Sequence, residues 1–188
     1  MSSTTFFLSL LALIVVERLV ELRIAKRNTA LLKARGALEF GGKHYGLIVL
    51  LHTTFFIGIV LEFFLGNRSL PYYFTIPLLA FAVAQILRAS VLYSLSTRWT
   101  TRIIVLPGEE LISSGPYRFL RHPNYLAVAL ELLSLPLIFG LWDTAILFSL
   151  LNAFVLLRIR IPAEEKALKW SRSAVAVGNN PPPLLVEP

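Results

Sequence analysis

The chain has 188 residues, 56% of them hydrophobic, and a mean hydropathy of +0.70, far above that of an ordinary soluble domain. It contains no cysteine, which excludes disulfides, thiolate nucleophiles and zinc–thiolate sites. Its formal net charge is +7, but the basic residues lie in loops beside apolar runs, where anionic lipid headgroups are found, and no nucleic-acid-binding motif is present. The composition therefore predicts an integral membrane protein without a nucleic-acid partner.

Five apolar runs follow one another along the chain, and several approach the ~20 residues needed to cross a hydrocarbon core. They cover residues 5–23, 45–66, 72–95, 124–142 and 144–158. We therefore expect an all-α fold, a polytopic membrane helix bundle of about five transmembrane helices. The last run is short, so we expect its helix to continue beyond the membrane surface.

The domain organisation follows from these runs. Residues 1–175 form a single integral-membrane domain with no internal repeat, and the unusual motifs lie within residues 97–170. Residues 176–188 are rich in proline and are expected to be a disordered tail.

Loop charges predict the orientation. Lysine and arginine are concentrated in residues 26–43, in residues 98–121 and after the last apolar run, whereas the two other loops contain only Arg68. Because cytoplasmic loops carry an excess of Lys and Arg, the N-terminus is expected outside and the C-terminus in the cytoplasm. The motifs would then lie at the cytoplasmic face of a multi-pass protein of the bacterial inner (plasma) membrane.

Several polar side chains fall inside the predicted spans, where a charge costs roughly 2.5–3.5 kcal/mol even on a lenient scale. They are Glu17, Arg18, Glu21, Gln85, Arg88, Glu131 and Asn152. One interpretation is that they line a polar pocket. The alternative is local neutralisation, because Arg18 and Glu21 are three residues apart on a helix, and Arg88 can extend to the interface. Glu131 fits this alternative least, since no basic residue lies within four positions.

The stretch SGPYRFLRHPNYL, residues 114–126, opens the fourth apolar run. Pro123 suits the first turn of a helix, where its missing N–H costs nothing, and this places His122 at the helix mouth. Free backbone N–H groups at a helix start, flanked by Arg118 and Arg121, are typical of an anion site. The alternative is an interfacial belt, in which Tyr and Arg only anchor the helix end.

The stretch RIPAEEKAL, residues 160–168, follows the fifth run. Arg160 and Glu164 share a face if the segment is helical, and Pro162 indicates a kink or restart. A surface ion pair on a solvated helix is the alternative. With the first motif, this segment suits a zwitterionic ligand such as S-adenosylmethionine, although these residue types also allow a nucleotide or a lipid headgroup.

The two stretches, LISSGPYRFLRHPNYL and then RIPAEEKAL, resemble the isoprenylcysteine carboxyl methyltransferase family of membrane enzymes. That family's pattern is G-x-Y-x-x-x-R-H-P-x-Y followed, after a helical hairpin, by R-x-x-x-E-E, and the resemblance covers about residues 99–170. The segments VELRIAKRN and GALEFGGKHY, with His52, resemble a bacterial branch found with type III polyketide synthases, which methylates alkylpyrones and related lipids.

The resemblance implies a methyltransferase that uses S-adenosylmethionine and O-methylates a carboxylate, or an acidic enol or phenol, on a lipid-like acceptor entering from the bilayer. It implies no metal. The cofactor-binding residues that it implies are Glu109, Glu110, Leu111, Ile112, Tyr117, His122, Pro123, Asn124, Tyr125 and Glu164. Arg160 matches the family's substrate-orienting arginine, and Arg102 falls near another cofactor-contacting position.

Arg160 and His122 are the candidate catalytic residues. A carboxylate, with a pKa near ~4, needs no base for methylation, and neither does the acidic enol of a hydroxypyrone. A phenol, with a pKa near ~10, would need help from His122 or a glutamate.

Three other functions compete with this interpretation. Membrane reductases that use NADPH carry a similar RHPNY run but place an acidic residue shortly after the tyrosine, where this chain has Leu126, Ala127 and Val128. A phospholipid N-methyltransferase differs only in its acceptor. A non-catalytic lipid-binding protein would show an intact bundle without cofactor affinity.

Overall fold

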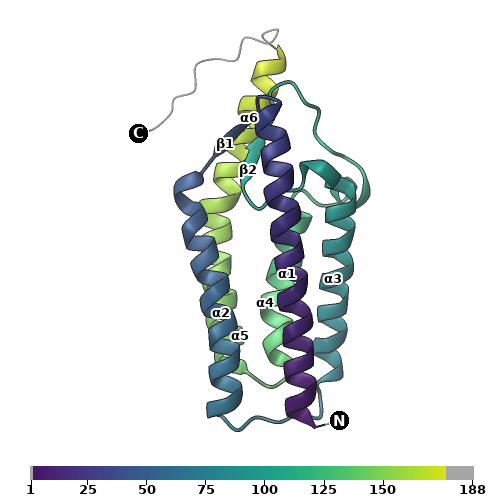
Figure 1. Ribbon diagram of the computed structural model, residues 1–188, viewed down its shortest axis with the longest axis vertical. Helices are drawn as coiled ribbons and strands as arrows, with labels where there is room; N and C mark the ends of the chain where they lie inside the picture. The colour runs from purple at the N-terminus through teal and green to yellow at the C-terminus, as the bar shows by residue number, and fades with distance from the viewer. Residues whose placement is uncertain (1, 177–188) are drawn as a thin grey trace.

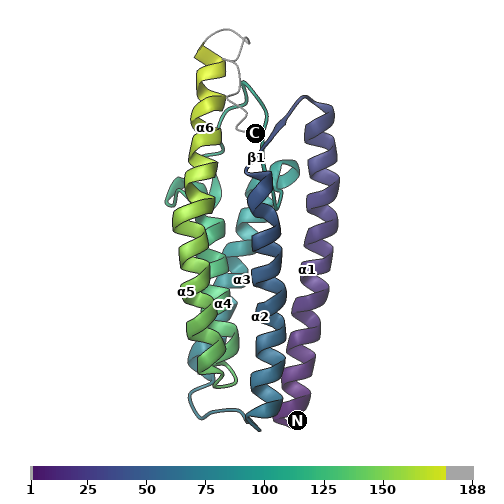
Figure 2. The same ribbon diagram turned by 90° about the vertical axis from the view of Figure 1, so that its left-hand side faces the viewer.

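The computed structural model describes residues 2–176, with side chains to residue 173. Six α-helices make up most of this part (Figure 1). They are α1 (Ser3–Ala34), α2 (Tyr45–Leu65), α3 (Thr75–Leu95), α4 (Pro123–Leu137), α5 (Trp142–Val155) and α6 (Ile161–Ala176). Helices α1 to α5 stand side by side as an elongated bundle, and α6 continues α5 past one end, which we call the motif end (Figure 2). The predicted tail, beyond its first residue, lies outside the described residues.

The spans agree in part with the prediction. Three helical stretches are long and apolar enough to cross a membrane: Gly42–Leu65, Thr75–Arg98 and Trp142–Ser173. Helix α4 is apolar but has only 15 residues. Helix α1 is long, at 32 residues, and extends well past the predicted end at residue 23, because Ala25, Asn28 and Leu32 continue its buried face.

A two-stranded antiparallel sheet at the motif end shows that the all-α expectation was incomplete. Strand β1 (Leu38–Phe40) pairs with β2 (Ile103–Val105), with Glu39 opposite Ile104. Ile103 and Val105 point inward and pack with Ala167 of α6. The sheet ties the end of α1 to the segment that precedes the first motif, and its strands are too short for a period-2 pattern to stand out in the sequence.

The fourth predicted span ends earlier than expected, at Leu137 instead of residue 142. Gly140 has φ +68°, and backbone bonds from Leu141 N to Pro136 O and from Gly140 N to Leu137 O close the helix. This is the αL helix end for which glycine is suited. Helix α5 therefore begins directly afterwards, at Trp142.

The fifth span does continue as a helix, as predicted. A single π turn, η4 (Leu156–Arg160), joins α5 to α6. Pro162 lacks the N–H that would continue the regular α-helical bonding, and a π turn accommodates such a break without ending the helix. The turn also places Arg160, which is 8% exposed, toward the interior.

The core lies between the helices. Phe7 of α1 stacks on Phe63 of α2 with ring centroids 3.9 Å apart, and Phe139 meets both rings edge-on. Helix α3 packs closely along α4, α4 along α5 and α5 along α2. Helix α1 instead makes its principal close backbone approaches at the motif end, to β2 and the short helix η2 (Ser96–Arg98).

Candidate functional site

The first motif forms a turn and a helix start at the motif end. A short helix, η3 (Gly115–Arg118), packs near α3. Gly115 has φ +58°, and a Cβ there would lie 2.2 Å from Ser94 Oγ, so only glycine fits. Pro123 then occupies the first turn of α4 with His122 as its N-terminal cap, as the sequence predicted.

Four side chains from the two motifs converge, and we call His122, Tyr125, Arg160 and Glu164 the quartet. The Tyr125 hydroxyl donates to a Glu164 carboxylate oxygen and accepts from Arg160 Nε at 3.2 Å. Arg160 Nη2 also donates to the carbonyl of Thr101 at 2.8 Å. A buried arginine is thus oriented by a backbone carbonyl and by a tyrosine that itself bonds to Glu164.

His122 completes the quartet. Its Nδ1 lies 3.7 Å from Glu164 Oε1, its Nε2 lies 3.7 Å from Glu165 Oε1, and its ring stacks on Tyr125. The Glu164 carboxylate beside Nδ1, with the Glu165 carboxylate, outweighs burial and raises the pKa of His122 above its usual range. Tyr117 also lies near Glu164. Burial is the main cause that raises the pKa of the Tyr117 hydroxyl, and the negative charge of Glu164 raises it further.

The raised pKa predicts a pH-dependent contribution of His122 to stability. Since the folded pKa exceeds the unfolded value of ~6.5, the contribution is complete below pH ~6.5 and is lost as pH rises through the folded pKa. We expect His122→Asn to lower the midpoint of thermal unfolding more at pH 5.5 than at pH 8.5. Equal losses at the two pH values would contradict the pairing.

Two buried polar atoms at this helix mouth suit a ligand. His122 Nδ1 and Asn124 Oδ1 have no hydrogen-bond partner within the described part of the chain. Buried polar groups are nearly always hydrogen-bonded, so such atoms call for a partner that the protein itself does not supply. A cofactor carrying an ammonium, a carboxylate and ribose hydroxyls, such as S-adenosylmethionine, has groups to match both an acceptor oxygen and a ring nitrogen.

The segment from Glu109 to Ile112 lies apart from the quartet, and no hydrogen bond or ion pair joins the two among residues 2–176. Glu109 pairs with Arg35 at 3.2 Å and Arg98 at 3.1 Å, and Arg98 Nη1 donates to the Glu110 carbonyl at 2.6 Å. Its residues face an open cavity of about 330 Å³, lined by Glu109, Glu110, Leu111 and Arg172. Ile112 is half-buried.

Arg172 was not among the predicted site residues. It lies on α6 eight positions after Glu164, a spacing that returns roughly to the same face of the helix, and this was the only signal available.

The three other arginines predicted near the site, Arg118, Arg121 and Arg102, do not contact the quartet in the described structure. Arg118 and Arg121 are exposed, and neither forms an ion pair with a described residue, so they do not close on the helix mouth. Arg102 binds Glu39 at 2.5 Å and lies over the ring of Tyr45, which fixes the sheet to α2. The bond to Arg102 and that to Lys33 outweigh partial burial and lower the pKa of Glu39.

The polar residues of the spans form a closed charge ring made of Arg18, Glu21, Arg88 and Glu131. Arg18 Nη1 donates to Glu21 at 2.8 Å and its Nη2 to Glu131 at 3.3 Å. Arg88 donates to both Glu21 oxygens at 2.7 Å and to Glu131 at 3.1 Å. The local pairing of Arg18 with Glu21 is thus confirmed. The alternative in which Arg88 extends to the interface does not hold, because Glu21 and Glu131 bind its guanidinium within the bundle.

The remaining polar span residues lie beside or away from this ring. Gln85 Nε2 donates to Glu17 at 2.9 Å, and Arg18 approaches both side chains. Asn152 is buried on α5.

Comparison with known proteins identifies a family and two relatives. Residues 76–170 match the model of the isoprenylcysteine carboxyl methyltransferase family. A Bacillus subtilis protein described as uncharacterized protein YpbQ is 42% identical over 164 residues, covering 87% of this chain and 96% of the relative. A Haemophilus influenzae protein, described as uncharacterized, is 32% identical over 162 residues, covering 84% of this chain and 91% of the relative. No solved structure matches.

The matched region contains α4, the quartet and the segment at residues 109–112. The competing reductase, phospholipid N-methyltransferase and non-catalytic interpretations gain no support from these comparisons. The chain belongs to the isoprenylcysteine carboxyl methyltransferase family of membrane methyltransferases.

Proposed function

We propose that this protein uses S-adenosylmethionine to O-methylate a lipid-like acceptor, either a carboxylate or an acidic enol or phenol. The observation that carries the proposal is the quartet, in which Tyr125 is hydrogen-bonded to Arg160 and Glu164, 35 and 39 positions later in the sequence, beside His122. The cluster lies where two helices reach the motif end, and two buried polar atoms beside it lack protein partners in the described residues.

The residues at the helix mouth would hold the cofactor. His122 Nδ1 and Asn124 Oδ1 offer unsatisfied hydrogen-bonding atoms, and Glu164 offers a carboxylate for an ammonium or ribose hydroxyls. Tyr117, Pro123 and Tyr125, with the segment from Glu109 to Ile112, would supply the surrounding walls. When bound, the cofactor supplies an electrophilic methyl group on a sulfonium.

Arg160 would orient the acceptor. Its guanidinium is already fixed by Tyr125 and Thr101, so little side-chain entropy remains to be lost when it donates to an acceptor oxygen. Methyl transfer is an in-line displacement, for which positioning supplies most of the catalysis. A carboxylate or acidic enol arrives ionised, whereas a phenol needs a proton acceptor, a role open to His122 in its neutral form.

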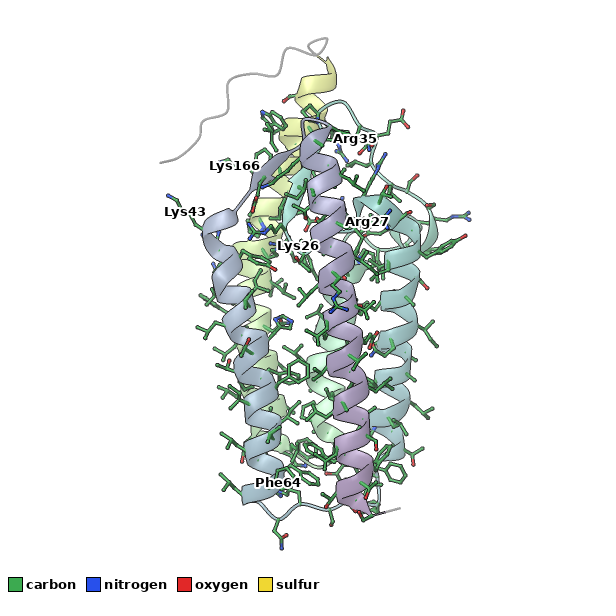
Figure 3. The ribbon with its side chains drawn as sticks, in the orientation of Figure 1. Lys26, Arg27, Arg35, Lys43, Phe64 and Lys166 are labelled. Carbon is green, nitrogen blue, oxygen red and sulfur yellow. The ribbon has the colours of Figure 1, made fainter. Side chains whose placement is uncertain are left out.

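The membrane orientation is part of the proposal. Figure 3 shows Lys26, Arg27, Arg35, Lys43 and Lys166 toward the motif end and Phe64 at the opposite end, where Figure 1 marks the N-terminus. The positive-inside rule then places the motif end in the cytoplasm and the N-terminus outside, with the acceptor entering from the bilayer. Reporter fusions at Asn67 and at the C-terminus should report opposite sides of the membrane. Signals from the same side would contradict a five-span bundle.

The function can be tested on purified protein with labelled S-adenosylmethionine and a lipid extract, followed by mass spectrometry of the labelled product. We expect Arg160→Ala to lower transfer about 10- to 100-fold, the loss typical of one charge-assisted hydrogen bond, with cofactor affinity largely unchanged. Arg158→Ala is the matched control, because Arg158 lies on the same turn but is exposed. Absence of cofactor binding in the folded wild type would overturn the proposal.

A further inference from the structure

The segment VELRIAKRN, residues 20–28 of α1, presents a row of buried side chains toward the motif end. Glu21, Ala25 and Asn28 lie on one face of the helix, at helical spacing. Glu21 belongs to the charge ring, and Ala25 belongs to a small buried cluster that includes Trp99. Asn28 is only 5% exposed, and its side chain reaches the loop that follows α3. A buried amide in such a place calls for an account of what it holds.

The side chain of Asn28 binds the short helix η2 at both ends. Its Nδ2 donates to the Ser96 carbonyl at 3.0 Å and to the Trp99 carbonyl at 2.9 Å. Ser96 has φ +48° and ψ −119°, a conformation that residues other than glycine rarely adopt. Such a conformation persists only where the surrounding structure holds it. The two hydrogen bonds from Asn28 supply that hold.

The helix η2 carries Arg98, which connects it to the segment at residues 109–112. Arg98 Nη1 donates to the Glu110 carbonyl at 2.6 Å, and its Nε lies 3.1 Å from a Glu109 carboxylate oxygen. Glu109 and Glu110 both line the open cavity of about 330 Å³. Arg35 of α1 also pairs with Glu109, at 3.2 Å, but its side chain is exposed, and such pairs contribute little. Arg98 is therefore the stronger link between α1 and this segment.

We propose that Asn28 is a positioning residue for cofactor binding, which fixes η2 and, through Arg98, the wall formed by Glu109 and Glu110. The inference rests on the proposed function and extends the site to α1, outside the matched residues 76–170. Among the residues that the structure describes, Asn28 donates only to the two carbonyls of this turn. Its effect on the cofactor is therefore transmitted through the turn.

Asn28→Leu tests the inference, because leucine is close to asparagine in size but has no side-chain N–H. Calorimetric titration with S-adenosylmethionine should show an affinity about fivefold lower, the change that corresponds to one net hydrogen bond. Hydrogen exchange followed by mass spectrometry should show faster exchange in residues 96–112. Asn152→Leu is the matched control, the same change at a buried asparagine of α5, and it should leave the affinity unchanged.

Two double variants show whether the effect passes through the turn. Ser96→Gly removes the backbone strain at this position, so it should restore the affinity of Asn28→Leu to within about twofold of the wild type. In an Arg98→Ala background, Asn28→Leu should change the affinity by less than about twofold, because the link to residues 109–112 is already broken. Damage to α1 in general would give neither result.

Wild-type affinity in folded Asn28→Leu would overturn the inference, and so would a loss of about fivefold that persists in the Arg98→Ala background. If Asn28→Leu does not fold, Asn28→Ala takes its place. Failure of both to fold would show that Asn28 serves stability alone, and would also overturn it. Failure of the proposed function is seen separately, since the folded wild type would then not bind S-adenosylmethionine.

Discussion

Replacing Glu164 with alanine should weaken S-adenosylmethionine binding about 10- to 100-fold. Glu164 is the centre of the quartet: it accepts from Tyr125 and lies 3.7 Å from His122. Hydrogen bonds to charged groups contribute ~1.5–3 kcal/mol, and the variant would lose both the carboxylate offered to the cofactor and the order that it imposes on the site. Calorimetric titration of the folded variant measures the effect.

Glu165→Ala is the neighbouring control. Its side chain is 45% exposed and, among the described residues, pairs with His122 alone, at 3.7 Å, so we expect a loss of about threefold or less. His122→Ala should also weaken binding, and the double variant with Glu164→Ala should lose less than the sum of the single losses, because the two groups act on one ligand. Wild-type affinity in both single variants would show that the motif only anchors a helix end.

Replacing Arg88 with methionine should cost ~3–5 kcal/mol of unfolding free energy, the largest stability effect that we expect in this chain. The variant removes three hydrogen bonds and leaves Glu131, within the part of the chain that the structure describes, with a single weak partner, Arg18 at 3.3 Å. An unpaired charge in such surroundings is far more costly than a well-packed apolar side chain. Denaturation in mixed micelles measures the change.

Two further variants distinguish the loss of the charge ring from a general destabilisation of helix α3. Ser90→Ala removes the hydroxyl of a half-buried residue that donates to the Ile86 carbonyl of its own helix, and it should cost less than ~0.5 kcal/mol. The double variant Arg88→Met with Glu131→Leu should recover part of the loss, because Arg18 and Glu21 still neutralise each other. An Arg88→Met protein as stable as the wild type would show that the ring contributes nothing.

The sequence by itself determined the class of protein, most of its helices and the two motifs. Apolar runs fill long helices because backbone groups in lipid must bond within their own segment, so composition predicts structure directly there. Pro123 at the start of α4 and the continuation of α5 past Pro162 were also local properties, readable from a few neighbouring residues. The family motifs were legible for the same reason, since each is a short continuous stretch.

Only the tertiary structure decided which of these residues meet. The sheet pairs residues about 65 positions apart, and Arg88 finds its partners on two other helices, so the rule that neutralises charges three or four positions apart could not place it. Pairing at a distance depends on helix packing, and local sequence does not encode it.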